Sequence, residues 1–313
     1  MSFPCSDDER RWHTFSFETK KLFGKRAVKV MLEAGMTCPN RDGRKGYGGC
    51  RFCSSGGASD SNPHTREDLL QQYLLNRELL LKKWPDALSI PYFQSFTNTY
   101  TSVQRIREMC APFLQREEVA AIALATRADC LPEEMIACLC ELQQEKPIWL
   151  ELGLQTVHDR TAQQMNRCHS YAQFRETVSK LAKTPLRVCV HLINGLPGES
   201  TEDMLENVRE VAKLPIQGIK FHMLNILEDS ALGRDYLKDP FPLLTQEEYI
   251  DLLVQQLELL PPEITVERIC SDPPRRGLIA PSWVLERKRV QNALKNELIR
   301  RDTYQGRRYE RQE

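Results

Sequence analysis

Three cysteines in one glycine-rich loop are the residues whose types and spacing point most directly to chemistry. Eleven residues separate Cys38 from Cys50, two separate Cys50 from Cys53, and four of the residues between Cys38 and Cys50 are glycines. Thiolates bind zinc or iron–sulfur clusters. Glycine lets the backbone approach such a group closely, because it has no Cβ atom. The pattern therefore predicts a metal or cluster site in this loop.

The spacing alone leaves the kind of centre open. Three thiolates leave a four-iron cluster with one iron that lacks a protein ligand, where a cofactor or substrate can bind. Zinc takes four ligands, and His64 can supply the fourth beside Cys38, Cys50 and Cys53. A cysteine loop that binds no metal is the third alternative. The other cysteines form no Cys-x-x-Cys pair, which predicts that there is no second cluster.

The loop resembles the cluster loop of the radical S-adenosylmethionine (SAM) superfamily, in the Elp3-related branch of bacterial proteins. That branch has this wide first gap, and Phe52 lies where the superfamily has an aromatic residue before its last cysteine. The resemblance implies that Cys38, Cys50 and Cys53 bind a [4Fe-4S] cluster whose fourth iron chelates SAM. One electron then cleaves SAM to methionine and a 5′-deoxyadenosyl radical, which takes a hydrogen atom from the substrate.

Alternating strands and helices must position this loop. Apolar runs and helical periodicity predict six or seven strands with helices between them. The strands are expected at residues 27–32, 89–96, 119–126, 148–155, 187–194, 218–223 and 264–270, and the helices at 66–84, 102–114, from 133, 171–183, 201–214 and 245–260. Such alternation predicts an α/β fold with a parallel sheet, either an open barrel or a doubly wound sheet.

The family resemblance decides between these two folds. The superfamily folds as a partial (β/α)6 barrel with its cluster loop after the first strand. The resemblance therefore implies a core barrel at residues 27–270, with an N-terminal extension at 1–26 and a basic C-terminal extension at 271–313. In such barrels the reacting groups lie at the C-terminal ends of the strands.

Polar residues and glycines near those strand ends are the candidates for cofactor binding. They are Gln94, Ser95, Arg127, Glu151, Gln155, Gly195 and Glu199. Because an arginine can fork onto a carboxylate, Arg127 either holds the carboxylate of SAM or pairs with Asp129. Segments 126–130, 153–156 and 195–199 are similar to family motifs around the cofactor. Gln94 and Ser95 are the nearest counterparts of the groups that hold its amino-acid moiety.

Glu151 lies inside an apolar strand, where a buried carboxylate needs a polar partner. The sequence predicts a polar contact in the barrel interior for Glu151 and a contact with cofactor or ribose for Gln155. His191 is either a core histidine or a pocket residue, and Lys220 and His222 are expected to share the face toward the pocket.

The stretch from Asn166 to His169 resembles the family's Asn-Arg-x-His. Because it is basic and expected above the barrel mouth, Arg167 and His169 are predicted to act on the substrate. Cys168 between them is either a hydrogen-atom donor or a plain exposed thiol.

The composition of the chain limits the cellular compartment and the partners to be expected. The chain has 313 residues, and its 43 lysines and arginines balance 43 acidic residues, so any basic patch is local. The N-terminus is polar, and no apolar run reaches the roughly 18 residues of a spanning helix. With eleven cysteines, this pattern predicts a cytoplasmic protein with reduced thiols and no membrane partner. The basic stretch from Glu286 onward is either an ion-paired, solvated helix or an RNA contact.

The resemblance implies a radical SAM enzyme, and its Elp3-like kinship implies C5 modification of the tRNA wobble uridine. The expected partners are tRNA and a reductant such as flavodoxin or ferredoxin. A small-molecule or peptide substrate is the alternative among enzymes. A zinc-binding RNA module without catalytic activity is the alternative from another class of protein, and metal analysis separates it from a cluster protein.

Overall fold

Seven parallel strands form one curled sheet in the computed structural model, which describes residues 3–6, 9–57 and 64–310. The strands follow the order β1-β2-β3-β4-β5-β6-β8. They are β1 (Ala27–Leu32), β2 (Leu88–Phe93), β3 (Ile122–Thr126), β4 (Ile148–Gln155), β5 (Arg187–Asn194), β6 (Gly218–Met223) and β8 (Thr265–Arg268). A doubly wound sheet would reverse this order at a switch point. The predicted open barrel is therefore confirmed.

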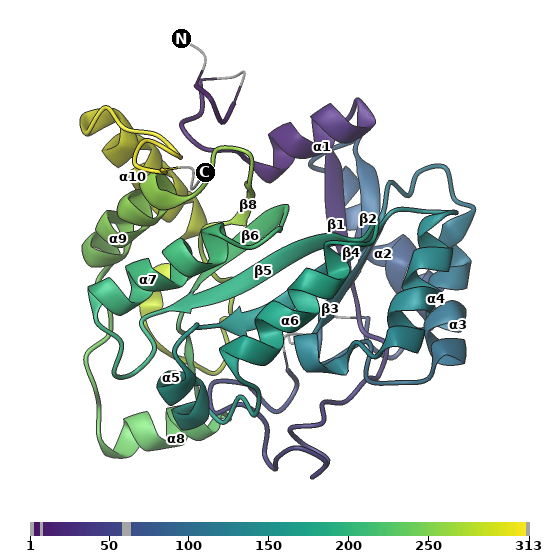
Figure 1. Ribbon diagram of the computed structural model, residues 1–313, viewed down its shortest axis with the longest axis horizontal. Helices are drawn as coiled ribbons and strands as arrows, with labels where there is room; N and C mark the ends of the chain where they lie inside the picture. Colours follow the sequence, from purple (N-terminus) through teal and green to yellow (C-terminus); the bar gives the residue numbers. More distant parts are fainter. Residues whose placement is uncertain (1–2, 7–8, 58–63, 311–313) are drawn as a thin grey trace.

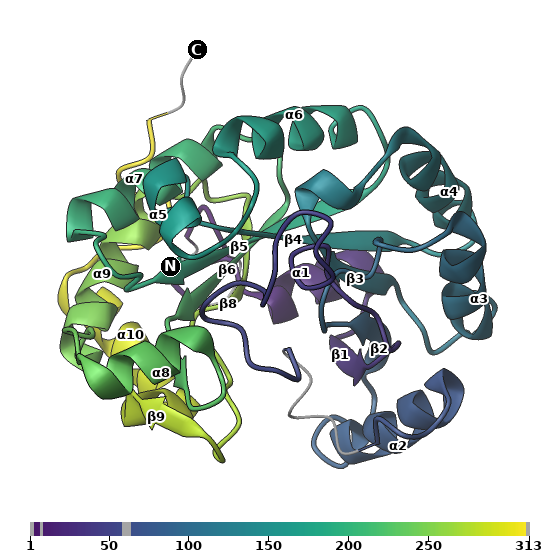
Figure 2. The same cartoon turned by 90° about the horizontal axis from the view of Figure 1, so that it is seen from below.

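Helices cover the outer face of the curled sheet, as Figures 1 and 2 show. They are α2 (Leu69–Leu81), α3 (Val103–Leu114), α4 (Glu133–Gln143), α6 (Tyr171–Leu181), α7 (Thr201–Ala212) and α9 (Gln246–Leu259). The apolar core lies between these helices and the sheet, where Phe93, Phe113 and Phe174 are fully buried. All five residues of β3 are buried, which explains why its sequence is a continuous apolar run.

One end of the barrel is covered by α1 (Phe15–Phe23). Thr14 caps this helix by accepting a hydrogen bond from the amide of Phe17, and it also pairs with Val266 of β8. The rings of Phe15 and Phe23 each lie 6.0 Å from the ring of Trp149 in β4. In Figure 1 this helix lies at the top, whereas the loop after β1 lies at the bottom.

Smaller elements that the sequence did not predict add to this frame. They are α5 (Asp159–Gln164), α8 (Ala231–Lys238), β7 (Ile226–Leu227), β9 (Leu278–Ala280) and the short 3-10 helices η1 (Ala128–Cys130) and η2 (Ser282–Leu285). Near the C-terminus, α10 (Arg287–Arg300) packs on α9 and fully buries Val290, Leu294 and Leu298. One face of this helix in the basic C-terminal stretch is therefore apolar and packs into the core.

The predicted boundaries of β1, β4, β5 and β6 agree with the structure at both ends. The second strand was predicted to reach Phe96 but ends at Phe93, because Phe96 has a φ of 61°, which a strand does not allow. The first long helix begins at Leu69 rather than at residue 66, because Asp68 caps it by accepting a hydrogen bond from the amide of Gln71.

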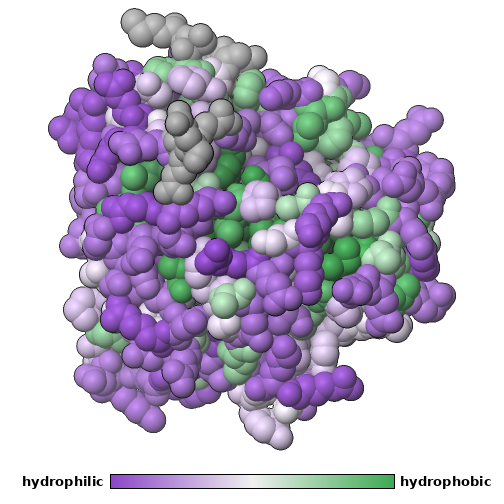
Figure 3. Space-filling view, viewed as in Figure 1, coloured by the Kyte–Doolittle hydropathy of each residue, from purple (hydrophilic) through white to green (hydrophobic). Residues whose placement is uncertain are grey.

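Hydrophilic side chains cover most of the face in Figure 3, with small hydrophobic areas between them. Within the described part of the chain, no helix combines the length and the apolar character needed to cross a membrane.

Candidate active site

The cysteine loop crosses the C-terminal end of the sheet, as Figure 2 shows, and it is tied to the segment after α5. The amide of Arg51 donates to the carbonyl of Met165 (3.1 Å), and the side chain of Asn166 donates to the carbonyl of Gly49 (2.8 Å). A Cβ atom on Gly46 would lie 2.3 Å from the Asn40 side chain. This glycine is therefore required by close packing.

Hydrogen-bond donors, one of them positively charged, surround the sulfur of Cys50, which is buried. Arg167 Nη1 lies 3.3 Å from Cys50 Sγ, and Asn40 Nδ2 lies 3.6 Å from it. A hydrogen bond from the Cys53 thiol and the positive charge of Arg167 lower the pKa of Cys50 well below its usual value. Cys50 is thus held ready as a thiolate, the form that binds metal.

The spacing of the sulfurs bears on the zinc alternative. In a tetrahedral zinc site, neighbouring sulfur ligands lie about 3.8 Å apart, because each zinc–sulfur bond is about 2.3 Å long. Among the described residues, the groups that could hold a single metal ion do not include Cys38, Cys50, Cys53 and His64. The buried hydrogen-bond donors at Cys50 and the glycine-rich backbone fit a multi-iron cluster better than a single ion.

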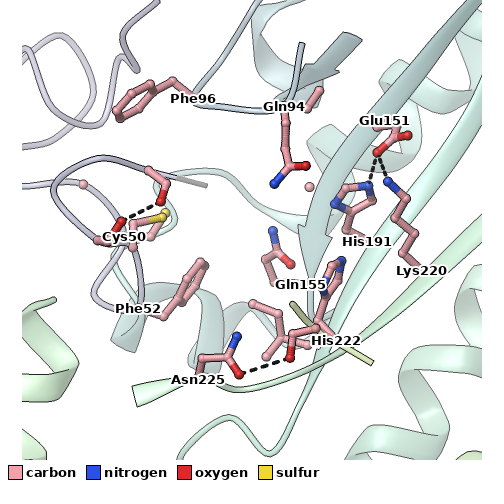
Figure 4. Close-up of a pocket in the computed structure, with 18 of the residues that line it drawn as sticks. Cys50, Phe52, Gln94, Phe96, Glu151, Gln155, His191, Lys220, His222 and Asn225 are labelled. Atoms are coloured by element: carbon pink, nitrogen blue, oxygen red, sulfur yellow. Dashed lines mark hydrogen bonds and ion pairs between the residues drawn. The ribbon is translucent and has the colours of Figure 1, made fainter. Parts of the chain in front are cut away.

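A cavity of about 290 Å³ lies between the cysteine loop and the ends of the strands. In Figure 4, Cys50 and Phe52 lie on one side of it, and Glu151, His191 and Lys220 lie on the opposite side. Gln94 and Gln155 lie between these two groups. The loop and the strands therefore form two chemically different walls.

Arg127 pairs with Asp129, one of the two alternatives that the sequence left open, and keeps one nitrogen without a partner in the described part of the chain. Its Nε and Nη2 atoms bind the Asp129 carboxylate at 2.9 and 3.0 Å. Its Nη1 atom is buried and has no hydrogen-bond partner among the described residues, although Arg127 lines the cavity. Burial alone would raise the pKa of Asp129, but hydrogen bonds from Arg127 and Lys45 hold it well below its usual value. One nitrogen of Arg127 is therefore left for a ligand.

Four of the predicted cofactor residues line the cavity, and three do not. Gln94, Arg127, Glu151 and Gln155 lie in its wall, whereas Ser95, Gly195 and Glu199 lie outside it. The predicted contacts of Gly195 and Glu199 with adenosine and ribose thus gain no support from their positions.

Local packing explains where these two residues lie. A Cβ atom on Gly195 would lie 3.1 Å from Met223 Cε. Glu199 accepts hydrogen bonds from Thr156 and from Asn207 Nδ2 (3.2 Å), and thereby ties the end of β4 to α7.

Arg167 and His169 lie beneath the cysteine loop and are only 5% and 9% exposed. Arg167 Nη2 donates to the carbonyl of Gly153 and to His169 Nε2 (2.8 Å). Burial and the charge of Arg167 lower the pKa of His169 to about 3, so its ring is neutral and can accept this bond. The turn is tight, since Asn166 and Cys168 both have positive φ. Arg167 lines the cavity and His169 does not. Both residues help to hold the cysteine loop, and their contact with substrate stays a prediction.

Glu151 makes three polar contacts inside the barrel. Its Oε1 accepts a hydrogen bond from Lys29, and its Oε2 accepts from Lys220 and from His191 Nε2 (2.8 Å). Lys29 also pairs with Glu267. Burial lowers the pKa of Lys220 to about 8, although Glu151 opposes this shift.

Sequence reasoning missed Arg268, which lines the cavity, and it missed Lys29 and Glu267 as members of the charge network around Glu151. The available signal was an isolated charged residue within an otherwise apolar strand, as for Lys29 in β1.

Comparison with known proteins identifies the class. The Radical SAM superfamily matches residues 37–211, and the Radical_SAM C-terminal domain matches residues 216–300. The chain belongs to the radical SAM superfamily and is a radical SAM enzyme. Within the superfamily it lies in an Elp3-related branch with two bacterial proteins.

Uncharacterized protein YtqA of Bacillus subtilis is 42% identical over 311 residues, which cover 99% of this chain and 97% of YtqA. Protein YhcC of Escherichia coli K12 is 33% identical over 270 residues, 86% of each chain.

Relatives beyond this branch share less of their length with the chain. The Elp3 structure from the archaeon Methanocaldococcus infernus aligns with a TM-score of 0.66 at 16% identity, covering 89% of this chain and 64% of that one. This structural similarity supports the assignment of the partial barrel fold. A tRNA uridine(34) acetyltransferase of the same organism is 24% identical over 206 residues, 65% of this chain and 36% of that enzyme.

The cofactors of this enzyme are a [4Fe-4S] cluster and SAM. When bound, they supply the reductive cleavage of SAM that yields a 5′-deoxyadenosyl radical. Cys38, Cys50 and Cys53 are the residues that would hold the cluster, and Arg167 would donate a hydrogen bond to one of its thiolates. The strand ends and the cysteine loop line the cavity on two sides and would position a substrate between them.

Proposed function

We propose that this enzyme modifies tRNA at C5 of the wobble uridine. The observation that carries the proposal is the similarity to a tRNA uridine(34) acetyltransferase over 65% of this chain. It is supported by the Elp3-like barrel, which extends over most of the chain. In this proposal a flavodoxin or ferredoxin in the cytoplasm supplies the electron. The eleven cysteines, all free thiols, suit such a reducing compartment.

The outer part of the cysteine loop has the side chains that an RNA contact needs. Tyr47 is 80% exposed and Arg44 is exposed close to it, whereas the exposed Lys45 is paired with Asp129. Exposed aromatic rings stack on unpaired bases, and basic side chains bind the phosphate backbone. Because this loop crosses the mouth of the cavity, an RNA bound on it would present a splayed base to the site.

The C-terminal basic stretch supports RNA binding less than the sequence indicated. Arg287 pairs with Asp272, Arg289 with Glu286, and both Arg300 and Arg301 with Glu297. These pairs neutralise part of the positive charge of the stretch, although Lys288 and Lys295 form no ion pair with the described residues, and this pairing fits the alternative of an ion-paired helix in part. We therefore place the main RNA contact on the cysteine loop.

Nucleoside analysis of a deletion strain tests the proposed function. Mass spectrometry of its tRNA should show a wobble uridine that lacks the modification or stops at a precursor. A plasmid with the wild-type gene should restore it, and a plasmid with Cys50→Ala should not. An unaltered wobble uridine in the deletion strain, together with no tRNA binding at low salt, would favour a small-molecule or peptide substrate.

A further inference from the structure

The wall of the cavity opposite the cysteine loop has more positive than negative charge. Glu151, Lys220 and Arg268 line this wall, and the ion pairs of Lys29 with Glu151 and Glu267 complete the charge network around Glu151. The two carboxylates of this network, Glu151 and Glu267, meet three cations, Lys29, Lys220 and Arg268. Asp272 also lines the cavity, but Arg287 neutralises it. The neighbouring histidines, His191 and His222, add no charge, because burial lowers the pKa of both. The surplus is one positive charge.

Arg268 carries this surplus. The two lysines are held by carboxylates, since Lys29 binds both glutamates and Lys220 binds Glu151. Arg268, at the end of β8, lines the cavity, and its side chain makes no hydrogen bond or ion pair with any residue that the structure describes. Its guanidinium therefore has all of its donors available to a ligand.

His222 offers a second available group on the same wall. Its ring, on a residue of β6, lines the cavity 5.3 Å from the ring of His191. Its Nε2 atom is buried and has no hydrogen-bond partner among the described residues. Buried polar atoms in native proteins are nearly always paired, so an orphaned one in a cavity wall indicates a ligand.

Binding of SAM does not explain the surplus positive charge of this wall. In this family the amino-acid part of SAM is held at the cluster, so its carboxylate belongs to the cysteine side of the cavity. The free Nη1 of Arg127 lies in the wall of that same cavity, and the adenosine part of SAM has no negative charge. We therefore expect Arg268 to bind an anion other than the carboxylate of SAM.

We propose that Arg268 and His222 form a subsite for a carboxylate group of the substrate. One surplus positive charge balances the single charge of a carboxylate, whereas a phosphate dianion would leave an uncompensated buried charge. The planar guanidinium also matches a carboxylate with two parallel hydrogen bonds. The inference rests on the proposed function only in taking this cavity as the place where the substrate reacts.

Acetate is a suitable probe, because it is the smallest carboxylate with a methyl signal for saturation-transfer NMR. Cluster-loaded enzyme with SAM, free of RNA, should bind acetate. Arg268→Gln and His222→Phe should each weaken its binding about tenfold or more, the effect of losing a hydrogen bond to a charged group. Arg268→Lys should retain part of the affinity. Arg105→Gln, on the exposed surface of α3, is the matched control and should bind acetate as the wild type does.

Iron content and SAM affinity of each variant show whether it has folded. Equal acetate affinity in folded Arg268→Gln and wild type would overturn the proposal, as would an absence of saturable acetate binding in wild type. Tighter binding of inorganic phosphate than of acetate through the same two residues would also overturn it. Because the assay contains no RNA, its outcome is independent of the nucleoside analysis.

Competition distinguishes two sources of the carboxylate. If tRNA from the deletion strain displaces acetate and fully modified tRNA does not, the carboxylate is on the RNA substrate. If neither tRNA displaces acetate, the carboxylate is on a free small molecule. Both results support the subsite.

Discussion

Arg167 Nη1 lies 3.3 Å from the sulfur of Cys50, so a guanidinium from the loop after α5 donates to the cysteine loop after β1. The two residues are 117 positions apart in the sequence. Hydrogen bonds to cluster sulfurs stabilise the reduced, more negative state and thereby raise the reduction potential. This contact gives Arg167 a way to tune the electron transfer that starts the reaction.

Replacing Arg167 with methionine should therefore lower the reduction potential of the cluster, on the order of 50 mV. Arg167→Lys should fall between this variant and the wild type. The measurement is a redox titration followed by electron paramagnetic resonance, with Arg105→Met as the control. A wild-type potential in an Arg167→Met protein with full iron content would contradict this role.

The three loop cysteines should be the protein ligands of the cluster. Alanine at Cys38, Cys50 or Cys53 should remove iron and abolish SAM cleavage, because two thiolates hold a four-iron cluster poorly. Alanine at Cys138 or Cys140 in α4 should leave the iron content unchanged. Iron and acid-labile sulfide analysis checks both sets, and equal iron loss in all five variants would disprove the assignment.

Arg127→Ala should weaken SAM binding by about 1.5–3 kcal/mol, the size of a hydrogen bond between charged groups. Anaerobic calorimetry with cluster-loaded protein measures this change. Because Arg127 also neutralises Asp129, the double variant Arg127→Ala/Asp129→Asn separates the two effects. It should restore thermal stability but not SAM affinity, and recovery of SAM affinity would limit Arg127 to the ion pair.

Lys220 should make the free energy of unfolding increase with pH between about pH 8 and pH 10.5. Its pKa in the folded protein is about 8, below the value of 10.5 in an unfolded chain. Between these values the unfolded state binds more protons, so wild type should gain stability relative to Lys220→Met as the pH rises. We expect a gain on the order of 2 kcal/mol. Thermal unfolding of both proteins near pH 8 and near pH 10.5 measures this gain. If the stability of wild type and of Lys220→Met changes equally with pH, the prediction is wrong.

Tyr47 and Arg44 should contribute to tRNA affinity without affecting SAM. Loss of a base-stacking ring in Tyr47→Ala should cost about 1–3 kcal/mol of tRNA binding. Arg44→Ala should weaken binding and reduce its dependence on salt, because one phosphate contact is lost. Gel shifts at two salt concentrations measure both effects, and SAM cleavage without RNA is the control. If Lys288→Ala and Lys295→Ala on α10 weaken binding more, the RNA surface lies at the C-terminus instead.

The sequence was sufficient wherever a local signal was strong. Apolar runs placed β1, β4, β5 and β6 correctly, because a buried parallel strand is apolar along its whole length. The Cys38–Cys53 spacing indicated a metal or cluster loop, because its ligands are close together in the chain. Polarity at the strand ends identified Arg127 and Gln155 as cavity residues, since the C-terminal ends of parallel strands meet at one edge.

Only the tertiary structure decided which distant groups neutralise one another. The sequence could not show that Glu151 is held by Lys29, 122 residues away, or that Arg167 donates to Cys50. Nor could it show that Arg268 lacks a partner while the arginines of α10 have theirs. Charges interact through space, so their pairing depends on how the strands are placed side by side and on which face of the sheet each side chain occupies.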